Sequence, residues 1–293
     1  MTNQLRYIFS SLRLQQWIKN FFLYAALIFS GNLFHTDLLV QVTFAFILFS
    51  ITASGIYVLN DLTDLEADKL HPEKSKRPLP AGNLSPRVAI AVCLILILAG
   101  VAGSIVLRPS FALVVAAYVV VNILYSFVLK NVVILDVMTI SAGFVLRVIA
   151  GAVVIDVPTS EWLLICTVLL SLFLGFSKRR HELTVLETEA NAHRSVLRHY
   201  SPYFLDQMIG IVTASTVMSY ALYAISDETV KKFGTNKLIY TVPFVLYGIF
   251  RYLYLVHRKV EGGNPTRLAL TDAPLLVNIM LWILAACIII YGK

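Results

Sequence analysis

Four carboxylates lie close together in the segment NDLTDLEAD, which begins at Asn60. They belong to Asp61, Asp64, Glu66 and Asp68, and the segment contains no lysine or arginine. A helix turns by ~100° per residue, so Asn60 and the three aspartates would share an arc of about 100°, with Glu66 on the opposite side. Such a ridge of oxygen atoms suits Mg²⁺, which binds through one or two carboxylates and shares its other positions with water and phosphates. We therefore expect Asn60 and the three aspartates to be metal ligands. The alternative is that the same residues form an acidic helix end that is exposed to water.

The residues that follow are basic. The stretch KLHPEKSKRPLPAG, residues 69–82, carries three lysines, one arginine and three prolines. The prolines end the preceding helix and stiffen the loop. A pyrophosphate group needs this combination, because a metal ion bridges its oxygens and basic side chains take the remaining charge. We expect Lys74 and Arg77 to bind such a group; the plainer interpretation is that they anchor the loop at the membrane surface.

The elements that must position these side chains are membrane helices. The chain has 293 residues, of which 58% are hydrophobic and 14% charged, with a mean hydropathy of +0.77. A transmembrane helix needs ~20 mostly apolar residues. Nine stretches qualify or nearly qualify: 18–34, 39–59, 88–107, 111–129, 132–154, 162–176, 204–225, 238–256 and 273–291. Period-two alternation is absent, which disfavours a barrel. The sequence predicts an all-α, polytopic membrane protein with about nine helices in a single domain, residues 1–293.

The distribution of lysine and arginine predicts the orientation of these helices. With a cytoplasmic N-terminus, 17 of them fall in inside segments and 5 in outside segments. Cytoplasmic loops carry the excess of positive charge. We therefore expect an inner (cytoplasmic) membrane protein with the N-terminus and the acidic segment in the cytoplasm and the C-terminus outside. The net charge of +7 then reports topology and does not indicate nucleic acid.

Polar side chains within or beside the spans form a second set of candidates. Arg147 lies near the middle of the fifth span, where a charge costs ~2.5–3.5 kcal/mol on insertion scales and usually has a function. Tyr125 and Lys130 lie on a polar stripe that descends the fourth span, and Lys19 lies one turn inside the first. Tyr57 shares the face of the acidic ridge. All five are candidate substrate-binding residues; pairing with another helix for Arg147 and snorkelling for the lysines are the alternatives.

A third group follows the sixth span. The segment SKRRHELTVLE contains Lys178, Arg179, Arg180 and Glu182, and Tyr200 and Asp206 flank the start of the seventh span. We expect these six residues to contact an anionic substrate. Neutralisation of Lys178 by Glu182 at the i, i+4 spacing is the simpler alternative, and capping by Ser201 is as good an account of the Asp206 region.

The acidic segment and the basic loop together resemble the first aspartate motif of the UbiA superfamily of intramembrane prenyltransferases. The matching positions are Asn60-Asp61-x-x-Asp64-x-x-x-Asp68, His71-Pro72-x-Lys74-x-x-Arg77-Pro78 and Ala81-Gly82. The resemblance implies helices around a central cavity that holds a long lipid. It also implies Mg²⁺ held by the aspartates, a bound pyrophosphate, and catalytic roles for Asp61, Asp64 and Asp68.

One departure from that family is informative. Typical members carry a second D-x-x-x-D motif after the sixth helix, where this chain has the basic residues 178–180. This departure, with the N-terminal stretch LRLQQWIKNFFLYAALIFSG, resembles the decaprenyl-phosphate phosphoribosyltransferase branch. That branch implies 5-phosphoribosyl 1-pyrophosphate as donor, a polyprenyl (decaprenyl) phosphate as acceptor and a place in cell-wall biogenesis. Tyr57 would then bond a ribose or phosphate oxygen.

Two other functions remain open at this point. A UbiA-type enzyme could instead move a polyprenyl group from its pyrophosphate to an aromatic acceptor, although it needs fewer basic residues. An organic-anion transporter would suit the spans and Arg147, but transporters bind near the bilayer midplane between interrupted helices. Here the densest polar group lies at one end of the helices. A homo-oligomer is compatible with the sequence.

Overall fold

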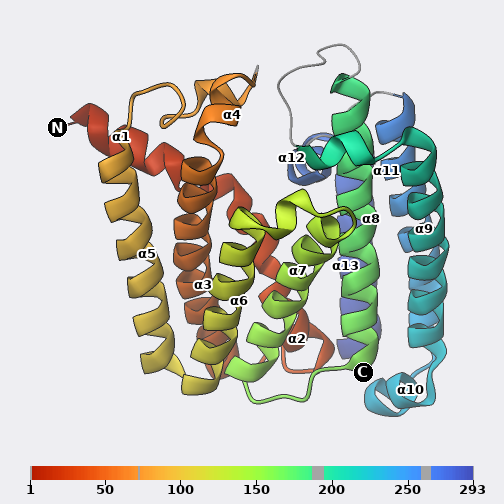
Figure 1. The fold of residues 1–293 in the computed structure, drawn as a ribbon. Coiled ribbons are helices and arrows are strands. Elements are labelled where there is room, and N and C mark those ends of the chain that lie inside the picture. The colour runs from red at the N-terminus through yellow and green to blue at the C-terminus, as the bar shows by residue number, and fades with distance from the viewer. Residues whose placement is uncertain (1, 72, 187–194, 259–264, 293) are drawn as a thin grey trace. The chain divides into compact units, whose positions relative to one another are not determined.

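The computed structural model describes residues 2–71, 73–186, 195–258 and 265–292, and within these ranges the chain forms helices and no strand (Figure 1). Eight of these helices are long and apolar enough to span a membrane. The all-helical, polytopic fold expected from the sequence is therefore confirmed. The chain divides into two compact units, which are described separately below.

The first unit draws on residues 1–27, 32–159 and 189–199. Its elements are α1 (Thr2–Ser11), η1 (Leu14–Phe22), α2 (Leu23–Phe29), α3 (Thr36–Thr63), α4 (Leu65–Lys69), η2 (Lys74–Lys76), α5 (Pro86–Leu107), α6 (Pro109–Phe127), η3 (Leu129–Asn131), α7 (Leu135–Val154) and η4 (Ser195–His199), where η denotes a 3₁₀-helix. Prolines begin α5 and α6, where a missing N–H costs nothing. Ser85 caps α5 by accepting from the Val88 N–H.

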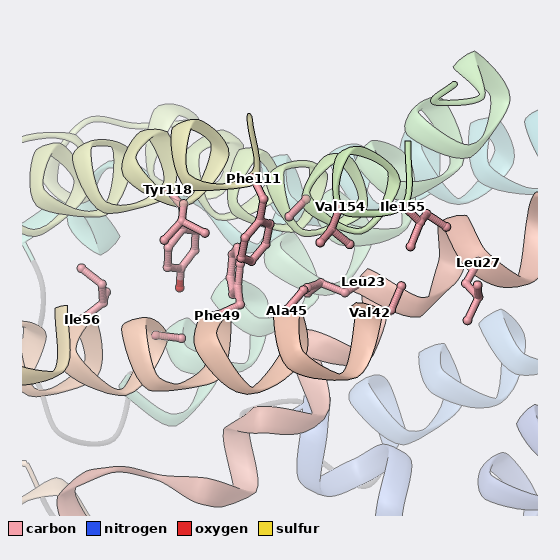
Figure 2. Packing of buried hydrophobic residues seen from close by; sticks show 13 residues of the cluster. Leu23, Leu27, Val42, Ala45, Phe49, Ile56, Phe111, Tyr118, Val154 and Ile155 are labelled. Atoms are coloured by element: carbon pink, nitrogen blue, oxygen red, sulfur yellow. The ribbon is translucent and has the colours of Figure 1, made fainter. Parts of the chain in front are cut away.

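The core of this unit lies between α3 and the helices α6 and α7 (Figure 2). Phe49 and Phe111 are fully buried there and Tyr118 nearly so. Two glycines allow backbones to approach closely, as small residues do between membrane helices. A Cβ on Gly100 would lie 2.1 Å from Thr52 Oγ1, and one on Gly151 would lie 1.9 Å from the Leu23 carbonyl oxygen. These contacts bring α5 against α3 and the N-terminal segment against α7.

The first predicted span differs from the prediction. The sequence predicts one α-helix over residues 18–34, whereas the chain forms the 3₁₀-helix η1 followed by the seven-residue α2. Side-chain contacts place this segment alongside α3 in the opposite direction: Trp17 bonds Ser54, Asn20 bonds Ser50, and Tyr24 bonds Thr43. At three residues per turn, positions 17, 20 and 23 face α3 together. Hydrogen bonding to α3 therefore accompanies the 3₁₀ winding that an apolar pattern alone does not reveal.

The second unit draws on residues 28–31, 160–188 and 200–293. Its elements are α8 (Glu161–Leu186), α9 (Pro202–Ile225), α10 (Asp227–Phe233), η5 (Lys237–Thr241), α11 (Val242–Arg258), α12 (Pro265–Thr271) and α13 (Ala273–Tyr291). Tyr220, Tyr223 and Leu238 centre its core, and Trp282 donates to the Tyr220 hydroxyl at 2.9 Å. Ser201 caps α9, as the sequence suggested, by accepting from the Phe204 N–H.

Candidate functional site

Two aspartates of the acidic segment share one guanidinium group. Nη1 of Arg77 lies 2.9 Å from Oδ1 of Asp61 and 2.8 Å from Oδ2 of Asp68. Lys74 adds a second cation, with its Nζ 3.2 Å from Oδ1 of Asp68. Both carboxylates are buried, and burial of a charge requires such partners. The basic residues of the loop between α4 and α5 thus contact the aspartates, as expected for a basic loop that directly follows the acidic segment.

The other two members of the segment face a different set of partners. Ser126, near the end of α6, donates to Oδ1 of Asn60, and Nζ of Lys130, in η3, pairs with Oδ1 of Asp64. Helix α3 ends at Thr63, and Asp64 leaves the α-helical region before α4 begins. The helical hydrogen bonds nevertheless continue across this residue, since the Asp64 N–H donates to the Asn60 carbonyl at 3.0 Å and the Asp68 N–H to the Asp64 carbonyl at 2.8 Å. The four side chains of the expected ridge thus divide into two pairs with different partners. Glu66 stands apart, as predicted: it is exposed, and its ion pair among the described residues is with Lys69.

Arg13 joins the site from the corner between α1 and η1, and sequence reasoning did not assign it there. Its guanidinium pairs with Oδ1 of Asp61 and lies over the Tyr57 ring, 5.5 Å from the centroid. Arg13 adopts the left-handed conformation, with φ 51°, which is uncommon outside glycine. Ser54 fixes the corner to α3 by donating to the Leu12 carbonyl at 2.9 Å. Burial lowers the pKa of Arg13 below its ordinary value, and the Asp61 carboxylate opposes that shift.

Arg147 lies deeper in the same unit, on α7, and is buried among aromatic rings. Its Nε donates to Oδ1 of Asn20 at 2.8 Å, Nη1 to the Gly143 carbonyl at 2.7 Å, and Nη2 to the Tyr118 hydroxyl at 3.1 Å. The guanidinium also lies 5.3 Å from the centroid of the Phe49 ring. Within the described residues no carboxylate forms an ion pair with it. Asn20 in turn donates to Ser50 of α3, so one amide ties Arg147 to two elements.

Lys19 completes the set of basic residues. It is partly buried in η1 and lies within electrostatic range of Arg147 and Arg13. Among the residues that the structure describes, Lys19 has no hydrogen bond or ion pair. A cation that neighbours other cations and has no anion beside it is placed to receive one.

These side chains form what we call the motif cluster. Its members are Arg13, Lys19, Asp61, Asp64, Asp68, Lys74, Arg77, Lys130 and Arg147. Six of them are cations and three are carboxylates. Asp136, in the first turn of α7, is a further buried carboxylate of this unit, and the cations still exceed the carboxylates when it is counted. The cluster therefore favours an anionic ligand.

The basic residues of α8 belong to the second unit and pair with carboxylates of that unit. Arg179 is buried and its Nη1 lies 2.6 Å from Oε2 of Glu182, which Lys178 also approaches at 3.7 Å. Nε of Arg180 donates to Oδ1 of Asp206 at 3.0 Å. The neutralisation of Lys178 by Glu182 considered above is thus present. A substrate role for these residues stays a prediction.

The remaining candidates are aromatic. Tyr200 is buried and stacks on Phe204 with the ring centroids 6.0 Å apart. Tyr125 is half-buried on α6, next to Ser126. Tyr57 lies beneath the guanidinium of Arg13, next to the motif cluster. Substrate binding by these tyrosines stays a prediction.

The donors at the motif cluster fit magnesium. Carboxylate and amide oxygens are hard ligands, and Nη1 of Arg77 shows that one cationic atom can contact Asp61 and Asp68 together. Among the described residues, three or more His, Cys, Asp or Glu side chains do not gather into a metal-binding group. The two carboxylates that share the Arg77 atom suit an ion whose other positions are left for water or phosphate oxygens.

Apolar helices long enough to cross a bilayer, with charged side chains gathered where α3 and α6 end, define an integral membrane protein with a polar site at helix ends. The sequence model described as "UbiA prenyltransferase family" matches residues 20–271. The chain belongs to the UbiA prenyltransferase family.

Individual relatives agree with this assignment. The chain is 32% identical over 287 residues to a decaprenyl-phosphate phosphoribosyltransferase of Mycolicibacterium smegmatis, with 94% of this chain and 90% of the relative covered. It is 32% identical over 286 residues to the enzyme of the same name from Corynebacterium glutamicum, with coverage of 96% and 86%. A UbiA homolog from Archaeoglobus fulgidus, solved with GPP and Mg²⁺, has a TM-score of 0.72 at 18% identity, with 97% and 99% covered. This last likeness supports the fold.

Proposed function

We propose that this protein transfers the 5-phosphoribosyl group of 5-phosphoribosyl 1-pyrophosphate to a polyprenyl phosphate and releases pyrophosphate. The observation that carries the proposal is the motif cluster, in which six cations surround three carboxylates. The relatives named above, aligned over nearly the whole chain, bear the name of this activity. Both substrates are anions, and the surplus of basic side chains matches them better than it matches one pyrophosphate and a neutral ring.

The leaving group is assigned to the aspartate side of the motif cluster. Asn60, Asp61, Asp64 and Asp68 would hold magnesium, which neutralises charge on the departing pyrophosphate. Lys74 and Arg77 reach the same carboxylates and can contact phosphate oxygens from that position. Lys19, without an anion of its own, supplies a further charge. Preorganised cations stabilise the negative charge that develops in the transition state, and such stabilisation is the largest single contribution to the rate in many enzymes.

The acceptor is assigned to the side of Lys130. Nζ of Lys130, in η3, pairs with Asp64, which is one of the candidate metal ligands. Lys130 is therefore placed next to the proposed metal and can contact a phosphate that approaches it. Arg147 spends three N–H groups on protein acceptors, and a guanidinium has five. Tyr57 is a further hydrogen-bond partner of the same guanidinium. The role of Arg147 is therefore to hold Asn20 and raise the local positive potential.

The reaction needs no strong general base. An oxygen of the lipid phosphate, already ionised, forms a bond to the anomeric carbon of the ribose while the bond from that carbon to pyrophosphate breaks. The electron pair of the broken bond leaves with the pyrophosphate. Holding the two anions in line accounts for much of the rate.

We also propose that the motif cluster faces the cytoplasm of an inner-membrane protein, with the N-terminus inside and the C-terminus outside. The excess of lysine and arginine in the segments between alternate spans supports this orientation. A water-soluble phosphoribosyl donor would then reach the site directly from the cytoplasm.

The test is a transfer assay on the purified, full-length protein. Labelled 5-phosphoribosyl 1-pyrophosphate and decaprenyl phosphate are incubated with Mg²⁺, with or without a chelator, and the lipid phase is counted. Labelled lipid that the chelator abolishes is the expected result. Absence of labelled lipid, or transfer that survives the chelator, contradicts the proposal. Release of pyrophosphate from a polyprenyl pyrophosphate in the presence of a hydroxybenzoate would select the aromatic prenyltransferase instead.

A further inference from the structure

The oxygens that a metal ion would need are the same oxygens that two arginines hold. Oδ1 of Asp61 accepts from both Arg13 and Arg77, and Arg77 continues to Oδ2 of Asp68. A magnesium ion binds carboxylate oxygens at ~2.0–2.1 Å in near-octahedral geometry. Its approach to those oxygens therefore displaces or reorients the guanidinium groups that contact them.

Among the residues that the structure describes, the ion pairs of the two arginines are those with Asp61 and Asp68. The charged groups that act on Arg13 are the carboxylates of Asp61 and Asp68, which attract it, and the guanidinium of Arg77, which repels it. Lys19, also within range of Arg13, adds further repulsion. An arginine that loses Asp61 in these surroundings must find a new anion.

The position of Arg13 suits such an exchange. Its backbone is fixed by the corner between α1 and η1, through the bond from Ser54 to the Leu12 carbonyl. Its side chain is 24% exposed, so the guanidinium can move while the backbone stays in place. A planar guanidinium matches the oxygens of a phosphate as well as it matches a carboxylate.

We propose that Arg13 and Arg77 are exchangeable counter-ions: they neutralise Asp61 and Asp68 before loading, and move to the diphosphate oxygens of the donor when a divalent ion takes the aspartates. This inference rests on the proposed function and adds Arg13 as a diphosphate-positioning residue of the same site. Each ligand removes an obstacle for the other. The metal frees the arginines for the diphosphate, and the diphosphate occupies the arginines that compete with the metal.

The consequence is a coupling between the two ligands that depends on Arg13. By thermodynamic reciprocity, pyrophosphate must raise the affinity for the metal by the same factor as the metal raises the affinity for pyrophosphate. Part of this factor comes from direct contact between metal and phosphate. The remainder comes from the arginines, and removal of Arg13 eliminates its share.

The experiment measures binding to the full-length protein in detergent. Mn²⁺ serves as the metal probe, followed by its paramagnetic resonance signal, and inorganic pyrophosphate serves as the anion, followed by calorimetry. The variants are Arg13→Asn, because asparagine tolerates the left-handed conformation, and Arg13→Lys, which restores the charge. Lys69→Asn is the matched control, since the ion pair of Lys69 among the described residues is with the exposed Glu66.

The proposal predicts opposite changes in the two affinities. Arg13→Asn should bind Mn²⁺ alone about threefold more tightly and pyrophosphate, with Mn²⁺ present, about tenfold more weakly, on the scale of one charge-assisted hydrogen bond. Arg13→Lys should lie between, and Lys69→Asn should match the wild type. Weakening of both ligands, or no change in either, overturns the inference and leaves the proposed function intact. A wild-type protein that binds no pyrophosphate with Mn²⁺ overturns both.

Discussion

Basic side chains gather at two places in this protein, and the two groups are balanced differently. In the motif cluster, cations outnumber carboxylates, Lys19 has no ionic partner among the described residues, and Arg147 is buried without a carboxylate. At the end of α8, Lys178 and Arg179 share Glu182, while Arg180 and His257 both reach Asp206. We call the second group the closed group, because each of these three basic side chains of α8 pairs with a carboxylate of the same unit.

This difference indicates that the motif cluster can bind an anion, whereas the ion pairs at the end of α8 connect helices. Asp206 lies on α9 and receives contacts from α8 and α11, so the closed group joins three helices of the second unit. The open group instead places its surplus charge around the aspartates of the family motif. The predictions below test this contrast, beginning with the largest effect.

Loss of one motif aspartate should nearly abolish activity. Asp64→Ala removes a metal ligand candidate and leaves Lys130 without its partner, so transfer should fall by about a thousandfold, the upper range for removing one preorganised charge group. Glu66→Ala is the matched control, because Glu66 is exposed and contacts only Lys69. Initial rates of lipid labelling measure both. Similar losses in the two variants would remove the distinction between the aspartate face and its opposite side.

Arg147 should matter for stability as much as for binding. Arg147→Lys keeps the charge but cannot reach Asn20, Gly143 and Tyr118 together, so we expect the free energy of unfolding to fall by ~2–3 kcal/mol. Denaturant unfolding in detergent measures it. The control is Arg108→Lys: Arg108 pairs with the exposed Asp156 and donates to the Val154 carbonyl, so this variant should change the free energy of unfolding by about 1 kcal/mol at most. Equal effects would contradict the buried, multiply bonded role of Arg147.

Removal of the unpaired cation should weaken binding of the donor. Lys19→Gln should raise the KM for 5-phosphoribosyl 1-pyrophosphate by about tenfold with a smaller change in kcat, since one charge-assisted contact to a phosphate is lost. Lys19→Arg should recover most of the loss. An unchanged KM in Lys19→Gln would show that the surplus charge does not hold the donor.

The closed group should give the smallest effect. Arg180→Gln and Asp206→Asn should each lower the free energy of unfolding by less than ~1 kcal/mol, because the pair that both remove is partly exposed. The double variant should lose less than the sum of the two single losses, although Asp206 also contacts His257 and Arg180 also contacts Thr184. Unfolding of the four proteins completes the cycle. If Arg180→Gln instead raised the KM for the lipid phosphate tenfold while Asp206→Asn did not, Arg180 would join the substrate site.

The fold and half of the site follow from local features of the sequence. Apolar length determines the spans, and the contacts of Asp61 and Asp68 with Arg77 follow because only a short, proline-stiffened loop separates them. The exposed position of Glu66 follows from helical spacing. These features depend on residues close in the chain, where propensity and spacing are informative.

The rest of the site depends on contacts between distant segments. Arg13 and Asp61 are far apart in sequence, and their meeting requires the left-handed corner at Arg13 and the 3₁₀ winding of η1. Asn20 could be found only by noticing that Trp17 and Asn20 repeat at a spacing of three. The ion pair of Arg180 with Asp206 joins two helices across 26 positions of the sequence, and the spacing of residues along one helix does not predict such a contact.

The winding of η1 also sets a rule for its length. Each residue of a 3₁₀-helix turns the chain by about a third of a circle and advances it ~2.0 Å. One inserted residue before Trp17 would point Arg13 and Lys19 in different directions. Three inserted residues would restore their relative orientation and increase their separation along the axis by ~6 Å. An insertion that keeps the two side chains in phase must therefore be a multiple of three residues, and each such step separates Arg13 further from Lys19.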